Sequence, residues 1–323
     1  MDEMCNSLIV SAAVLIFSLP TTQTPTKSGK TKPDKTEISG ERPVLWQNPV
    51  DIASRDLYYG PGGKAHEPHG LFTFEKEDMG GSNPKFDIVD QDGVKWRVKM
   101  GDEARPETAA SRLVWAVGYF ANEDYFMPEL HVQKMPRLRR GRDLVSRDGT
   151  VHNVRLKRHL KGEKKIGIWR WVDNPFTGTR EWYGLRVLMA VINNWDLKDP
   201  NNSVYQARQA PKQRYTVSDI GASFGTTGLS WTLRGNLNAY SHSKWIRRIS
   251  PGFIDFNVPS WPALNRWIGQ RIPIDDARWI GHLLARLSPH QIRDAFRAAG
   301  YSNQEVEGFS RVVERRIGEL QGL

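Results

Sequence analysis

The stretch NNWDLKDPNN, residues 193–202, sets Asp196, Lys198 and Asn201 directly after a segment of helical periodicity. Phosphoryl transfer uses such a set of side chains. A carboxylate orients the attacking hydroxyl, a cation offsets charge on the moving phosphoryl group, and an amide oxygen helps to hold magnesium. A solvated Asp-Lys-Asp-Pro turn has the same composition, so this stretch alone leaves both interpretations open.

A second carboxylate follows in YTVSDIG, residues 215–221, where a strand pattern runs into Asp219. Asp219 lies 23 residues after Asp196, and this length fits a small hairpin between them. An aspartate followed by x-Gly at a strand end is typical of a metal-binding carboxylate, and an ordinary turn aspartate is the alternative. With the hairpin in place, a catalytic Asp196 and a metal-binding Asp219 would face one cleft.

A lysine on a strand adds a third element. In KWRVKMG, residues 95–101, alternation places Lys95, Arg97 and Lys99 on one face of a strand. Lys99 can therefore reach toward nucleotide phosphates. Glu107, in the first turn of the next predicted helix, is a candidate partner that would fix its position, and Glu103 is the alternative partner. A carboxylate at a helix start is also favourable for dipole reasons alone.

The fourth element is the run GGSNPK, residues 80–85, one strand before the strand of Lys99. Glycines let backbone N–H groups approach phosphate oxygens closely, although a Gly-Gly-Ser turn is common by itself. We expect this run to bind nucleotide phosphates through Gly80, Gly81, Ser82 and Lys85.

The remaining patterns predict strands in the first half and helices in the second. Alternation around an Asp-Gly turn predicts a hairpin over 86–100, and strand-like pieces follow around 129–133 and 150–157. One helix is predicted to start at Pro106 and end near Gly118. Further helices are predicted over 181–194 and after the capping boxes that begin at Ser288 and Ser302.

The order of Gly-rich loop, strand lysine, helix glutamate, Asp-x-Lys-x-x-Asn and Asp-x-Gly resembles the protein-kinase-like superfamily over residues 80–221. The short path from Lys99 to Glu107 and the motif GGSNPKF, residues 80–86, look more similar to HipA-type and other atypical kinases.

This resemblance implies a two-lobed α+β fold, with a β-rich N-lobe over 43–165 that holds one main helix and a helical C-lobe over 166–323. It implies phosphate transfer from ATP with Mg²⁺ to an acceptor such as a protein Ser or Thr. The roles that it implies are a catalytic base at Asp196, support of the phosphoryl group by Lys198, magnesium ligands at Asn201 and Asp219, and phosphate contact by Lys99.

Several positions depart from the kinase pattern. Asn194-Trp195 replaces the usual His-Arg, Ile220 replaces the Phe of Asp-Phe-Gly, and Arg97 stands where a small residue normally packs against adenine. No Ala-Pro-Glu segment follows Gly221. A pseudokinase or nucleotide-binding scaffold therefore stays open beside an active phosphotransferase.

The charge balance favours an anionic partner. The net charge is +10 and the isoelectric point about 9.7. Two basic runs could bind nucleic acid, or border the cleft and recruit an acidic acceptor. In the second case, reversing Arg139 and Arg140 should weaken acceptor use without affecting ATP. The runs consist of Lys134, Arg137, Arg139, Arg140 and Arg142, and of Lys157, Arg158, Lys161, Lys164 and Lys165.

The N-terminal segment is expected to lie outside the folded part. Residues 8–19 are apolar but short for a bilayer span, so residues 1–20 are interpreted as a signal or anchor segment, which favours an exported or anchored protein over a cytoplasmic one. A Thr/Lys/Pro-rich run over 21–42 is predicted to be a disordered linker. The single cysteine, Cys5, excludes an intramolecular disulfide.

Overall fold

A computed structural model describes residues 42–323 of the chain, except 208–211, 228–231 and 259–262. The predicted signal or anchor segment, Cys5 and the predicted linker up to residue 41 lie outside the described residues. Among the described residues, no helix combines the length and the apolar character needed to cross a membrane.

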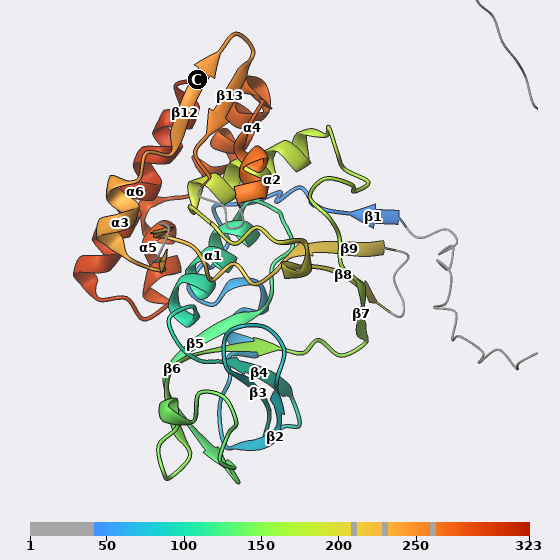
Figure 1. The fold of residues 1–323 in the computed structure, drawn as a ribbon, viewed down its shortest axis with the longest axis vertical. Coiled ribbons are helices and arrows are strands. Elements are labelled where there is room, and N and C mark those ends of the chain that lie inside the picture. Colours follow the sequence, from blue (N-terminus) through green and yellow to red (C-terminus); the bar gives the residue numbers. More distant parts are fainter. Residues whose placement is uncertain (1–41, 208–211, 228–231, 259–262) are drawn as a thin grey trace, which may run out of the picture. The chain divides into compact units, whose positions relative to one another are not determined.

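Strands of the first half close into a barrel in the order β2-β3-β4-β6-β5 (Figure 1). Its interior is filled by alternate side chains such as Phe86, Ile88, Trp96 and Val98. The predicted hairpin over 86–100 is confirmed, because β3 and β4 pair antiparallel around a turn in which Gly93 has a φ of +75°. The strands are β2 Phe72–Asp78, β3 Lys85–Asp90, β4 Lys95–Lys99, β5 Asp124–Gln133 and β6 Thr150–Arg158.

Helix α1, Ala104–Ala116, contacts β5 and β6 of the barrel on one side and α5 of the C-terminal half on the other (Figure 1). It begins two residues before Pro106, so the predicted start was wrong. Proline is tolerated there because the first-turn N–H groups have no intrahelical acceptor. The helix ends close to Gly118, whose φ of +97° favours glycine.

A separate 4-stranded sheet has the order β1-β9-β8-β7. Its strand β1 precedes the barrel in the sequence, and the other three strands follow it. The predicted boundary between residues 165 and 166 falls inside β7 and stays a prediction. Helix α2, Arg180–Val191, ends earlier than the predicted Asn194, because Asn193 adopts a left-handed φ of +53°. The strands are β1 Arg42–Val44, β7 Glu163–Gly167, β8 Asn202–Ala207 and β9 Lys212–Val217.

The C-terminal part is mainly helical and packs around an aromatic cluster that includes Phe224, Phe296 and Phe309. Both predicted capping boxes are present, at Ser288 and Ser302. The α+β prediction, with a sheet-rich first part and a helical second part, is confirmed. The remaining elements are α3 Leu237–His242, α4 Ile274–Leu284, α5 Pro289–Arg297, α6 Asn303–Gln321, β10 Thr226–Thr227, β11 Thr232–Leu233, β12 Ile246–Ser250, β13 Phe253–Phe256, β14 Ile272–Pro273, and 3-10 turns at Gly60–Gly62, Lys64–His66, Arg142–Leu144, Asp199–Asn201 and Ala263–Gly269.

Candidate active site

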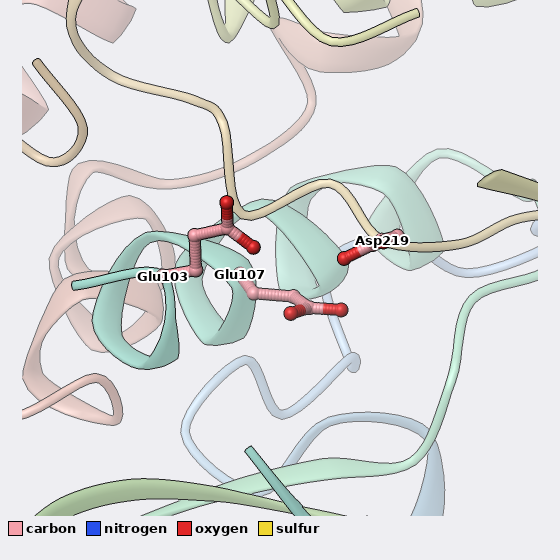
Figure 2. A group of neighbouring side chains, drawn as sticks. All are labelled: Glu103, Glu107 and Asp219. Carbon is pink, nitrogen blue, oxygen red and sulfur yellow. The ribbon is translucent and has the colours of Figure 1, made fainter. Parts of the chain in front are cut away.

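Lys99, the last residue of β4, is the centre of a charged cluster. Its Nζ lies 2.7 Å from Glu107 Oε2 and 3.0 Å from Glu103 Oε2. The same Nζ forms an ion pair with Asp219 Oδ1. Figure 2 shows the glutamates at the start of α1 and Asp219 on the segment after β9. One carboxylate oxygen of each of the three residues lies within 4.8 Å of the other two. The structure therefore gives Lys99 both glutamate partners that the sequence offered as alternatives.

The charges of this cluster stabilise one another despite their burial. Burial opposes the charge on the Lys99 ammonium, but the carboxylates of Glu107 and Asp219 outweigh this effect and hold the pKa of Lys99 above its ordinary value. Burial would raise the pKa of Asp219, yet Lys99 lowers it below the usual range. Both groups are therefore charged at neutral pH.

Sequence reasoning missed three charged partners of this cluster. Arg155 on β6 lies opposite Lys99 in register and contacts Glu107 Oε1 at 2.9 Å and the buried Asp124 at 3.5 Å. Arg234 lies 3.2 Å from Glu103 Oε1. The alternation of β6 was the available signal for Arg155, because it places a basic residue on the same face as Lys157.

The predicted phosphate loop connects β2 to β3, directly before the strand that pairs with the Lys99 strand. Gly81 has a φ of +70°, which favours glycine. Lys85, at the end of this loop, pairs with Lys99 across β3 and β4. Burial lowers the pKa of Lys85, and Asp219 partly offsets that effect. The structure thus brings the predicted loop, Lys85 and Lys99 to the same end of the barrel.

The predicted catalytic segment forms its own network of polar contacts. Lys198 Nζ lies 2.7 Å from Asp196 Oδ1. Asn201 Nδ2 donates to the Asp196 carbonyl at 2.7 Å and to Asp196 Oδ2 at 3.3 Å. Asn194 Oδ1 accepts from the backbone N–H of Asp196 at 3.0 Å and so orients the aspartate backbone.

The hairpin of β8 and β9 links this segment to Asp219, as predicted. The N–H of Ser218, next to Asp219, donates to the Asn201 carbonyl at 3.1 Å. Farther along, the N–H of Trp195 donates to the Ala222 carbonyl at 3.1 Å. These bonds hold the Asp196 and Asp219 segments side by side.

A cavity of about 330 Å³ begins beside Arg97, two residues before Lys99 on β4. Lys157, Tyr205 and Thr216 also line it. Arg97 donates to Asp87 at 2.8 and 3.1 Å, and this bidentate pair fixes the guanidinium against the barrel. The Lys157 ammonium donates to Tyr205 Oη at 3.0 Å. The wall of this cavity at Arg97 is therefore a paired arginine.

The side-chain oxygens of Asp219 and Asn201, whose segments the Ser218 N–H to Asn201 carbonyl bond joins, fit a hard divalent cation. Magnesium binds carboxylate and amide oxygens, and Asp219 and Asn201 supply one of each. Asn201 uses its Nδ2 toward Asp196, and among the described residues its Oδ1 accepts no hydrogen bond. The chemistry of this set is compatible with magnesium.

No protein-family model matches the sequence, and no curated protein matches it. The solved structures that resemble the fold include two kinases. The proinflammatory kinase CtkA of Helicobacter pylori aligns over 79% of this chain and 97% of its own, with 10% identity and a TM-score of 0.49. A Golgi casein kinase aligns over 78% of this chain and 72% of its own, with 9% identity and a TM-score of 0.35.

Proposed function

We propose that this protein is a magnesium- and ATP-dependent phosphotransferase with a protein-kinase-like site. The observation that supports it most strongly is that Lys99 on a barrel strand contacts both Glu107 on the next helix and Asp219 on the segment after β9. Kinases require a strand lysine paired with a helix glutamate and a metal-binding aspartate in the same cleft. An aspartate that only forms a turn is not expected to contact the buried Lys99–Glu107 ion pair.

The other residues can be given roles from their positions. Lys99 and Lys85 would bind phosphate oxygens, with Glu107 holding the Lys99 ammonium in place. Asp196 would accept the proton of the acceptor hydroxyl, and Lys198 beside it would offset charge on the transferred group. When bound by Asn201 and Asp219, magnesium would neutralise charge on the phosphates.

The base of the nucleotide would occupy the cavity beside Arg97. It lies along β4 from Lys99, so a nucleotide with its phosphates at Lys99 can extend into it. A closer relationship to HipA-type kinases is part of this proposal and rests on GGSNPKF, residues 80–86, and on the short path from Lys99 to Glu107.

The acceptor in this proposal is an acidic molecule, such as an acidic protein segment with a Ser or Thr. Arg137, Arg139 and Arg142 are exposed and follow β5, in the loop that reaches the Gly-rich run. Positive charge beside a cleft raises the local concentration of anionic substrates. The double variant Arg137→Glu/Arg139→Glu should slow phosphorylation of acidic peptides and leave that of neutral peptides unchanged.

The direct test is conversion of ATP to ADP by the full chain with magnesium. Wild type should turn over ATP or label an acceptor, and Asp196→Asn should bind nucleotide without turnover. Nucleotide binding without turnover in wild type would identify a pseudokinase. Absence of nucleotide binding would refute the proposal, and binding of DNA or RNA that falls steeply with salt would then favour a nucleic-acid partner.

A further inference from the structure

The segment between β5 and β6 folds back onto the Gly-rich loop, far from it in sequence. The backbone N–H groups of Arg139 and Arg140 donate to the Glu77 carboxylate, at 3.1 Å and 2.9 Å respectively. Gly141, with a φ of +64°, lies so close to Pro84 that a Cβ there would be 2.7 Å from the proline ring. This segment therefore contacts residues at both ends of the loop, Glu77 before it and Pro84 at its end.

The Arg140 side chain spans the loop itself. Its Nη1 donates to the Met79 carbonyl at 3.1 Å and to the Gly80 carbonyl at 3.4 Å. Its Nη2 donates to the Ser82 carbonyl. A single guanidinium thus holds carbonyl groups from both sides of Gly81, and its fork of donors suits this spacing.

These bonds determine where the loop N–H groups point. In a trans peptide the N–H is directed opposite to the C=O of the same unit. Because the Gly80 and Ser82 carbonyls face Arg140, the N–H groups of Gly81 and Asn83 face away from it. Within the described part of the chain these two N–H groups donate to no protein acceptor, whereas the Gly80 N–H donates to Asp78 Oδ1 at 2.8 Å.

A second cation lies against the loop at Gly81. A Cβ at Gly81 would be 3.0 Å from Lys85 Nζ, so the Lys85 ammonium lies beside the loop at this point. Successive N–H groups beside a cation form a concave site for an anion.

We propose that Arg140 is a positioning residue that holds the loop carbonyls outward, so that the Gly81 and Asn83 N–H groups are directed toward the phosphates of the nucleotide. This inference rests on the proposed function. Holding the loop before binding reduces the ordering cost that the ligand would otherwise meet. Because the Arg140 side chain binds the loop, reversing its charge should weaken nucleotide binding as well as acceptor use.

The test compares binding of Mg-ADP and of adenosine to full-length wild type, Arg140→Ala, Arg140→Lys and the control Arg147→Ala. Arg147 lies on the same segment between β5 and β6, is exposed, and among the described residues its side chain makes no hydrogen bond or ion pair. Arg140→Ala should weaken Mg-ADP binding about tenfold, the effect of one to two lost hydrogen bonds, with adenosine binding unchanged. Arg140→Lys should fall between, because one ammonium cannot span the carbonyl groups on both sides of Gly81, and Arg147→Ala should match wild type.

Hydrogen exchange provides a readout that needs no nucleotide. The amides of residues 79–83 should exchange faster in Arg140→Ala than in wild type or Arg147→Ala. Unchanged Mg-ADP affinity in Arg140→Ala, or an equal loss for adenosine, would overturn the role of Arg140 while leaving the proposed function in place. Failure of wild type to bind Mg-ADP at all would overturn the proposed function, and this inference with it.

Discussion

The Lys99 ammonium and the Glu107 carboxylate lie 2.7 Å apart, with side chains only 2% and 1% exposed. A buried charge without a partner is strongly destabilising, so each of the two depends on the other. The pair connects the barrel to α1, and Asp219 forms an ion pair with the same lysine. The same contact therefore supports the fold and fixes the lysine proposed to bind phosphate.

Lys99→Met should destabilise the protein. We expect a loss of about 3 kcal/mol in the free energy of unfolding, the lower end for a broken buried pair, because Arg155 still contacts Glu107. Urea unfolding at pH 7 measures it. The double variant Lys99→Met/Glu107→Gln should lose less stability than the sum of the losses of Lys99→Met and Glu107→Gln, because both single changes break the same pair. Additive losses would contradict the assigned pairing.

Asp87 should make stability depend on pH at the acid end. Burial acts to raise the pKa of Asp87, but His159 and Arg97 outweigh it and hold that pKa well below the ordinary value. Its stabilising contribution is therefore fully present above the unfolded-state pKa and is lost as pH falls toward the folded-state value. The free energy of unfolding of wild type should fall below about pH 5.

The matched variants for this effect are Asp87→Asn and Asp173→Asn, since Asp173 is exposed. Urea unfolding between pH 3 and pH 6 should show a shallower fall for Asp87→Asn than for wild type. Asp173→Asn should follow wild type. Parallel curves for wild type and Asp87→Asn would show that the pair with Arg97 contributes nothing.

Asp196→Asn should affect turnover and not nucleotide binding. Loss of a general base typically lowers kcat by about 10²- to 10⁴-fold, and Asp196 contacts Lys198 and Asn201 rather than Lys99. ATP turnover and Mg-ADP binding, measured on the same preparation, separate the two effects. Loss of nucleotide affinity equal to the loss of kcat would place Asp196 in binding instead.

Arg316 should stabilise the end of α2, directly before the predicted catalytic segment. This fully buried side chain donates to the Ala190 and Val191 carbonyls at 3.0 and 2.9 Å. Arg316→Met removes these two charge-assisted hydrogen bonds from a buried site, which should cost about 2–4 kcal/mol of unfolding free energy. Arg315→Met, on the exposed neighbour, should cost under about 1 kcal/mol. Equal effects in urea unfolding would contradict this role.

Local patterns were sufficient for much of the fold. The β3–β4 hairpin, both capping boxes and the α+β order follow from alternation, turn residues and helix caps, which act over a few positions. The start of α1 and the end of α2 were misplaced. Pro106 is equally compatible with several first-turn positions, and nothing nearby in sequence shows that Asn193 adopts a left-handed φ.

The site was predictable only where its chemistry lies in short motifs. Spacing indicated Lys99, Asp196 and Asp219, but not that Lys99 contacts Asp219 directly, because that contact joins residues 120 positions apart. The alternation of β6 and the basic run over residues 134–142 include Arg155 and Arg140, but neither pattern shows what these two side chains contact. Their roles arise from strand register and from a loop that returns to the barrel, which are properties of the tertiary structure.

The most direct test of the nucleotide site is urea unfolding of the full chain with and without Mg-ATP, for wild type, Asp219→Asn and the control Asp275→Asn. Asp275 is an exposed carboxylate on α4. At about 100 times its dissociation constant, Mg-ATP should raise the free energy of unfolding of wild type and Asp275→Asn by roughly 2.7 kcal/mol, and the increase should require magnesium. We predict that Asp219→Asn loses this increase. An equal, magnesium-independent increase in all three proteins, or no increase in wild type, would contradict the account.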